Sequence, residues 1–260
     1  MTPPPRETPH RLSEMTTVEA RHAVAASPVV ILPAGAFEQH GPGLPLATDL
    51  IRAEAVAERV AGRLGGRAVI GPSIPVGVSP HHLAFAGTLS LSTGTFRALV
   101  REYLDGLHRH GWRRVLVITG HGGNNAALTT VAQDLLAELP DLEFAWTPLT
   151  SLAADVVARM PTGEVHGHSG EAETAQMLHL APGLVHTDRL APGTTALSEL
   201  DGLARLARRP GHPVTQVRYD RLSPSGVLGD PRRAGAADGA DIVEAIVGRV
   251  TDYVQEWLKD

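Results

Sequence analysis

The feature that most constrains the fold of this 260-residue chain is the alternation of short apolar segments with helical patterns. Segments 28–35 and 114–119 are almost continuous runs of aliphatic residues, which is typical of strands buried on both faces. Weaker strand patterns cover 67–75 and 142–148. Repeated strand–helix units of this kind predict an α/β fold with a mainly parallel sheet flanked by helices.

Helical spacing of apolar residues predicts the elements between and after these strands. They cover 48 to about 63, with Thr48 as the expected cap, then a helix from about 93, one at 125–139 and a final one from about 238.

The remaining segments define the domain organisation. Residues 1–15 are proline-rich and polar, which favours a mobile arm, and 16–260 are expected to form one domain. Residues 183–218 carry several glycines and prolines, so we expect mostly loop there, with some helix near 197–208.

Composition excludes several classes of protein. The net charge of -5 gives no basic surface for nucleic acid, and no apolar run reaches the roughly 18 residues of a membrane span. The chain has no cysteine, which excludes disulfides and thiol nucleophiles, and its one lysine, Lys259, lies next to the C-terminal residue, where a Schiff base has no plausible role. The first residues lack the apolar core of a signal peptide, so a cytoplasmic location is expected.

Three separated stretches place carboxylate and imidazole side chains beside glycine or a turn. They are Glu38-Gln39-His40 with Asp49, Gly120-His121-Gly122-Gly123-Asn124, and His168-Ser169-Gly170-Glu171-Ala172-Glu173-Thr174. Zinc, manganese and ferrous iron all accept such ligands. The first two stretches follow predicted strands, and parallel α/β sheets bind ligands beyond the carboxyl ends of their strands. The pattern therefore indicates a metal-dependent hydrolase.

The first stretch suggests two ions. Glu38 and His40 are two apart on an extended segment, so their side chains are expected to point the same way and to hold one ion each. Asp49 would bridge the ions, because its two oxygens can bind metals roughly 3.5–4 Å apart, and a water shared at that spacing becomes a hydroxide nucleophile near neutral pH. Zinc is the metal that we expect at this site, although manganese and iron accept the same donors.

These motifs also resemble those of the creatininase family of amidohydrolases. The resemblance consists of five stretches in order: Glu38-x-His40-Gly41-x-x-x-Pro45 with Asp49, the segment Gly77 to Thr88, Gly-His-Gly-Gly-Asn, His168-x-Gly170-x-x-Glu173-Thr174, and Gly226 to Pro231. It implies hydrolysis of an amide carbon–nitrogen bond other than a typical peptide bond, a creatininase-like sandwich fold and a homo-oligomer, a hexamer in the family.

The resemblance further implies roles for individual residues. His121 would bind the ion also held by Glu38, and Glu173 would complete the shell of the second ion. His168 would pass a proton to the departing nitrogen, with Glu171 as a helper. His82, and Ser79 beside it, are expected to contact substrate, because polar loop residues beside a rigid sheet often bind ligands.

One position departs from the family pattern. Creatininase itself carries a glutamate ligand two positions after the histidine of the glycine-rich turn, and this chain has Gly123 there. The Gly-His-Gly-Gly-Asn version is similar to other branches, among them formamide hydrolases and the mycofactocin precursor peptidase. The substrate is therefore expected to be either a small amide or a short peptide.

The sequence also admits three other interpretations. The glycine-rich turn differs from a dinucleotide-binding turn at Asn125, where a third glycine belongs, and the segment around Ser79 lacks the second glycine of a serine-hydrolase elbow. A metal-free binding or scaffold protein with the same fold is the alternative from another class, and metal analysis would separate it from an enzyme.

Overall fold

The aliphatic segments form the centre of a parallel sheet. The computed structural model describes residues 10–208 and 211–259. Its strands, in the order β2-β1-β3-β4, are β2 (Ala68–Ile70), β1 (Val29–Ala34), β3 (Arg114–Thr119) and β4 (Glu143–Pro148). All three neighbouring pairs are parallel, which confirms the predicted fold class.

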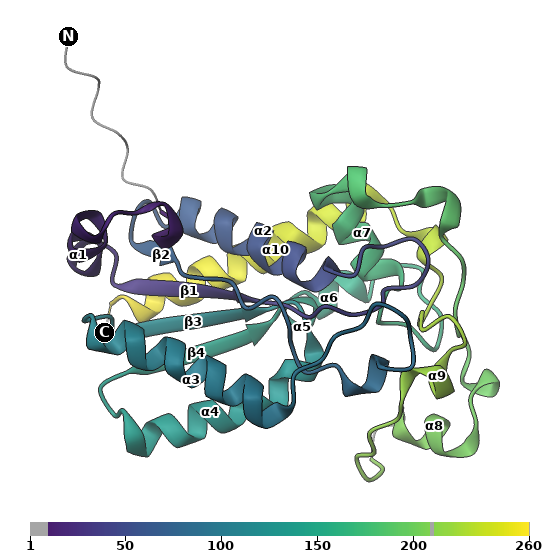
Figure 1. Ribbon diagram of the computed structural model, residues 1–260. Helices are drawn as coiled ribbons and strands as arrows, with labels where there is room; N and C mark the ends of the chain where they lie inside the picture. Colours follow the sequence, from purple (N-terminus) through teal and green to yellow (C-terminus); the bar gives the residue numbers. More distant parts are fainter. Residues whose placement is uncertain (1–9, 209–210, 260) are drawn as a thin grey trace.

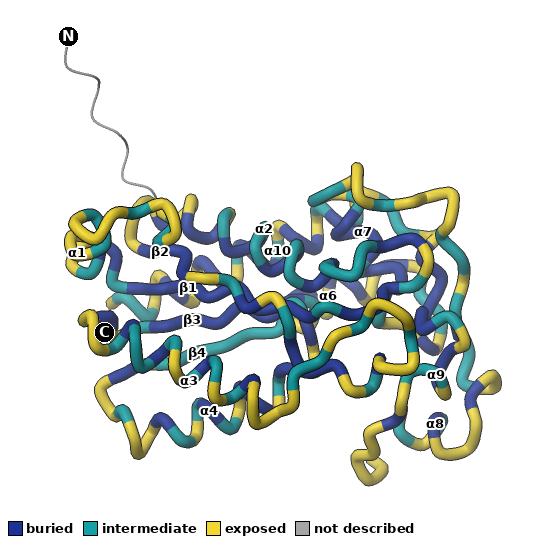
Figure 2. Tube along the Cα trace, in the orientation of Figure 1, coloured by how far each residue is buried: buried dark blue, intermediate teal, exposed yellow. Residues whose placement is uncertain are grey.

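Alternate side chains of each central strand enter two separate cores, one on each face of the sheet. Val29 and Ile31 of β1 belong to one core, and Val30 and Leu32 belong to the other. The first core is covered by α2 (Thr48–Arg63), α7 (Glu171–Leu180) and α10 (Ala236–Trp257), and the second by α3 (Thr93–Arg109) and α4 (Asn125–Glu138). Figure 1 shows these helices on opposite sides of the sheet, and Figure 2 shows that β1 and β3 are buried whereas β4 is only partly buried.

The shorter helices cap the two ends of this sandwich. They are α1 (Thr17–Ala26), α5 (Leu149–Leu152), α6 (Ala154–Val157), α8 (Gly202–Ala207) and α9 (Tyr219–Leu222). Residues 183–218 are mostly loop, as predicted, and a small apolar cluster that includes Leu200, Ala204 and Leu222 holds this region together. No helix in the described ranges is both long and apolar enough to cross a membrane.

Several expectations on local structure need correction. Thr48 does not cap α2: it is the first helical residue, and its hydroxyl donates to the carbonyl of Pro45. The strand expected over 67–75 has only three residues, and α1 was not predicted. Of the arm expected over 1–15, residues 1–9 lie outside the described residues. From His10 the chain follows the sheet edge, where the His10 carbonyl accepts from the amide of Ile70.

Two glycines let α2 begin at the ends of the central strands. A Cβ on Gly35 would lie 2.5 Å from the backbone nitrogen of Leu50, and one on Gly120 would lie 2.1 Å from the carbonyl oxygen of Asp49. Only glycine permits so close an approach. The first turn of α2, with Asp49, is therefore held where β1 and β3 end.

Candidate metal centre

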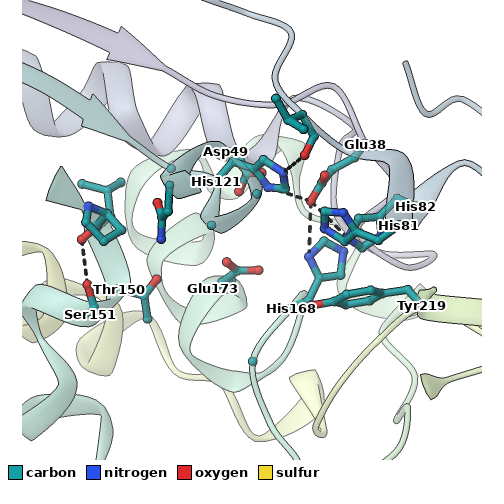
Figure 3. Close-up of a pocket in the computed structure, with 18 of the residues that line it drawn as sticks. Glu38, Asp49, His81, His82, His121, Thr150, Ser151, His168, Glu173 and Tyr219 are labelled. Carbon is teal, nitrogen blue, oxygen red and sulfur yellow. Dashed lines mark hydrogen bonds and ion pairs between the residues drawn. The ribbon is translucent and has the colours of Figure 1, made fainter. Parts of the chain in front are cut away.

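A large cavity opens beyond the carboxyl ends of the strands. Its volume is ≈ 1210 Å³ (Figure 3). Six of the nine predicted site residues line it: Glu38, Asp49, His82, His121, His168 and Glu173. His40 and Ser79 lie behind this lining as buried residues, and Glu171 is buried elsewhere.

The register of the sheet brings Glu38 and His121 together. Ala34 at the end of β1 is paired with Thr119 at the end of β3, so the segments that follow run side by side. His121 Nδ1 lies 3.3 Å from Glu38 Oε1 and 3.2 Å from Asp49 Oδ2. These three residues, far apart in sequence, therefore converge on one point at the strand ends.

A second group of donors lies on the other side of Asp49. His40 Nε2 is 3.4 Å from Asp49 Oδ1 and 3.7 Å from Glu173 Oε2. One donor atom from each of His40, Asp49 and Glu173 lies within 4.8 Å of the others, the spacing of ligands around a shared cation. Asp49 belongs to both groups, one oxygen facing each, which is the arrangement expected of a bridging carboxylate.

Backbone contacts orient both histidines as ligands. His40 Nδ1 lies 3.2 Å from the carbonyl oxygen of Glu38, and His121 Nε2 lies 3.0 Å from that of Val78. A carbonyl oxygen only accepts, so these nitrogens carry the protons. His40 Nε2 and His121 Nδ1 are the nitrogens that face the carboxylates, and after losing a proton each would offer its lone pair to an ion held there, as metal-binding imidazoles do.

Several of these buried atoms have no hydrogen-bond partner within the described chain. They are both carboxylate oxygens of Glu38, Nε2 of His40 and Oδ2 of Asp49. Leaving buried charged or polar atoms unpaired is costly, and a bound divalent cation would satisfy all of them at once. The donor set therefore fits a divalent metal centre.

Without metal, His40 and His121 carry the protons of the centre. Burial alone lowers the pKa of His40, but the negative charge of Asp49 outweighs it and raises that pKa to about 9. Burial also opposes protonation of His121, and Glu38 and Asp49 raise its pKa above the usual value. Against these imidazoliums, and despite burial, the pKa of Glu38 falls to about 2.

This charge state predicts that metal binding depends on pH. His40 is protonated at pH 7 in the metal-free protein, and its Nε2 must lose that proton to become a ligand. We expect zinc binding to release at least one proton per chain and to tighten as the pH rises from 6 towards 9. Titration calorimetry in two buffers with different ionisation enthalpies measures the release, and binding without proton release would contradict the prediction.

A buried arginine, Arg52, donates hydrogen bonds to two carboxylates of the centre, those of Asp49 and Glu173. Arg52 is fully buried in α2, and its Nη1 donates to Glu173 Oε1 at 2.8 Å and to Asp49 Oδ1 at 3.3 Å. It also donates to Gln176 Oε1 at 3.2 Å and to Thr150 Oγ1 at 2.7 Å. Sequence reasoning missed it, although its place on the apolar stripe of α2, four residues before Val56, was a usable signal.

His168 and His82 both lie beside Glu38, and both contact the side chain of Gln39. His168 Nδ1 and His82 Nε2 each lie 3.5 Å from Glu38 Oε1. Gln39 Nε2 lies 2.9 Å from His82 Nδ1 and 3.0 Å from His168 Nε2. Burial, then the charge of His40, lowers the pKa of His168, so its ring is neutral at pH 7 and able to take a proton.

Two predicted residues have other surroundings than expected. Ser79 is completely buried, and its hydroxyl lies 3.3 Å from His121 Nε2, so it supports a ligand and does not face the cavity. Glu171 accepts from the amide of Asp230 through Oε1, and Oε2 faces Gly229. The expectation that Glu171 assists catalysis therefore has no support from geometry, and its contacts instead tie α7 to the loop at 229–230.

The substitution at Gly123 has a steric reason. A Cβ at this position would lie 2.3 Å from His121 Nε2 and 2.3 Å from the carbonyl oxygen of Val78. A glutamate cannot enter without moving the His121 ring, and Glu173 instead faces His40.

This contact predicts a contrast between adjacent glycines. Gly123→Ala should displace the His121 ring, destabilise the protein by about 1–3 kcal/mol and weaken metal binding. Gly122→Ala is the matched control, because a Cβ there meets no atom within 4 Å. Metal titration and thermal unfolding of both variants measure the difference, and equal behaviour would refute the steric explanation.

Three further residues complete the centre without having been predicted. Asn124 is fully buried: it accepts from the amide of Val78 and donates to the carbonyl of Gly35, which joins three segments of the site. His81 and Tyr219 line the cavity. Asn124 stands within the glycine-rich motif, whereas no pattern in the sequence marked Tyr219.

The fold and this donor set define the class of protein, a metal-dependent hydrolase on an α/β sandwich. The family model described as "Creatininase: Creatinine amidohydrolase" matches residues 13–254. The chain therefore belongs to the creatininase family. As a member of that family it is an amidohydrolase, an enzyme that hydrolyses the carbon–nitrogen bond of an amide.

Relatives with described functions match over nearly the whole chain. The mycofactocin precursor peptide peptidase of Mycobacterium ulcerans (strain Agy99) is 35% identical over 254 residues, covering 95% of this chain and 92% of the relative. The creatinine amidohydrolase of Pseudomonas putida is 29% identical over 262 residues, with 94% and 96% coverage. A solved structure named "Creatininase Mn" superposes with a TM-score of 0.80 at 29% identity, covering 95% of this chain and 98% of that one. This neighbour and the donor groups support binding of a divalent metal.

Proposed function

We propose that this amidohydrolase cleaves an amide bond near the end of a short, peptide-derived substrate. The observation that carries the proposal is the size of the cavity, ≈ 1210 Å³, compared with roughly 300–1,000 Å³ for typical small-molecule sites. A ring as small as creatinine would fill little of this space. The greater identity to a precursor-peptide peptidase, 35% against 29%, supports the same choice.

The lining of the cavity suits an extended chain. Thr150 and Ser151 lie on one side of Glu173 and Tyr219 on the other, so the carboxylates stand partway along the cavity (Figure 3). Apart from the carboxylates at the centre and Arg218, the lining consists of uncharged residues and histidines. A substrate bound across the centre would therefore have room on both sides of its scissile bond.

In this proposal, one set of residues binds the metal ions and another residue transfers the proton. Glu38, Asp49 and His121 would hold one divalent ion, and His40, Asp49 and Glu173 the other. Ions bound there supply a polarising charge for the carbonyl group and lower the pKa of water. His168, neutral and beside Glu38, is placed to take up a proton and pass it to the departing nitrogen.

A hydrolysis screen tests this function. Zinc-loaded and manganese-loaded protein is incubated with tetra-alanine, an N-formyl amine and creatinine, and products are followed by mass spectrometry, with His40→Ala as the negative control. Cleavage of the peptide but not of creatinine supports the proposal. Turnover of creatinine alone would favour the small cyclic amide, which remains the second candidate because of the Pseudomonas putida relative.

The alternative that the protein is a metal-free scaffold is tested by measuring the metal content and the hydrolytic activity of the same purified protein. Fewer than one ion per chain, with no hydrolysis after zinc or manganese is added, would favour it. Zinc as the resident metal, two ions per subunit, a hexameric assembly and a cytoplasmic location also belong to the proposal. Elemental analysis, light scattering and cell fractionation measure these properties.

A further inference from the structure

Aromatic rings from distant segments form one wall of the cavity. Tyr219, at the start of α9, packs with its ring centroid 4.1 Å from that of His82 and 5.2 Å from those of His81 and His168. His82 and His168 in turn contact Glu38. The phenol ring is thus held one side chain away from the carboxylates that bind metal.

The hydroxyl of this tyrosine is not used by the fold. Within the described ranges, no residue makes a hydrogen bond to it. Figure 3 shows the hydroxyl end of the ring next to His168, directed towards the cavity. Burial, and after it the charges of Glu38 and Glu173, raise the pKa of Tyr219, although Arg208 opposes them. The hydroxyl therefore keeps its proton and is available as a donor.

A hydrogen-bond donor at such a place would assist amide hydrolysis, in addition to the charge of bound metal ions. The oxygen of a water molecule bonds to the carbonyl carbon, the carbonyl oxygen gains negative charge, and the carbon–nitrogen bond then breaks as the nitrogen leaves with a proton. Preorganised donors aimed at the developing charge lower the barrier. Glu38, Asp49 and Glu173 are carboxylates and only accept hydrogen bonds, so such a donor has to come from another wall of the cavity.

Building on the function proposed above, we propose that Tyr219 donates a hydrogen bond to the carbonyl oxygen of the scissile amide and keeps its proton throughout. The ring contacts with His81, His82 and His168 fix the direction of this donor. Tyr219 is thereby a further catalytic residue, supplied by a segment in which the sequence shows no regular pattern.

Tyr219→Phe tests the proposal, because it keeps the ring contacts and removes only the hydroxyl. With zinc-loaded protein and tetra-alanine or creatinine, whichever the wild type cleaves, kcat should fall by about 10²–10³-fold. The zinc content, the unfolding midpoint and KM should change little. Tyr253→Phe is the matched control, since Tyr253 is exposed on α10, far along the chain from the site.

A binding experiment separates this proposal from the proposed function. Acetohydroxamate, an amide-like metal ligand, should bind Tyr219→Phe about tenfold more weakly than the wild type, whether or not either probe is cleaved. A wild type that binds acetohydroxamate but cleaves neither probe would refute the proposed function alone. Unchanged kcat and unchanged acetohydroxamate affinity in Tyr219→Phe, or loss of zinc from this variant, would refute the role of Tyr219.

Discussion

Asp49→Asn is expected to abolish hydrolysis. The two oxygens of Asp49 face different partners, Oδ1 towards His40 and Oδ2 towards His121. An asparagine keeps the shape but presents a neutral amide, so one of these directions loses its anionic ligand and both ions lose shared charge. Metal ions supply several kcal/mol of transition-state stabilisation, and each 1.4 kcal/mol is tenfold in rate. We expect a loss of about a thousandfold or more, together with loss of metal.

The measurement combines elemental analysis with the hydrolysis screen. Asp134→Asn is the control, because Asp134 is a half-exposed aspartate on α4 that pairs with Arg97 and lies outside the cavity lining. It should bind metal and turn over substrate like the wild type. An Asp49→Asn protein that retains two ions and the wild-type rate would rule out the bridging role.

Arg52→Met is expected to cause the largest loss of stability. The guanidinium is fully buried and donates to four side chains from three helices, so its removal leaves Asp49 and Glu173 without their buried counter-charge. Removing one partner of a buried ion pair typically costs roughly 3–5 kcal/mol. We expect a loss of this size in the metal-free protein. Bound zinc should reduce it, because the cations neutralise the same carboxylates.

Urea unfolding with zinc and with a chelator measures both values. Arg52→Lys keeps the charge but lacks the planar fork that reaches four acceptors, so it should fall between the wild type and Arg52→Met. Arg249→Met removes an exposed partner of Asp155 and should leave the unfolding free energy nearly unchanged. If zinc leaves the loss in Arg52→Met unchanged, Arg52 does not act through the metal ligands.

The elements that could be predicted are those with a local signal. β1 and β3 are short, mostly aliphatic and bounded by glycine, proline or a polar residue, and α2 and α10 carry an apolar stripe at helical spacing, so a short stretch of sequence is enough to recognise each element. Element ends were less accurate because they depend on neighbours. The strand at 67–75 stops at Ile70, and Ile74 makes only a single bridge to Ala34.

The residues of the site also fall into two groups, those that the sequence pattern predicts and those that depend on tertiary packing. The sequence by itself identified Glu38, His40 and His121 as candidate ligands, because they follow strands whose carboxyl ends must meet in a parallel sheet. Arg52 is 121 positions from Glu173, and it became part of the site only through packing of α2 on α7. Tyr219 became part of it only through packing of α9 on the short helix Pro80–His82. Such contacts have no sequence period, since they depend on the distance between surfaces and not on spacing along the chain. Tertiary structure alone therefore decided that Arg52 contacts the carboxylates of Asp49 and Glu173 and that Tyr219 packs beside His82.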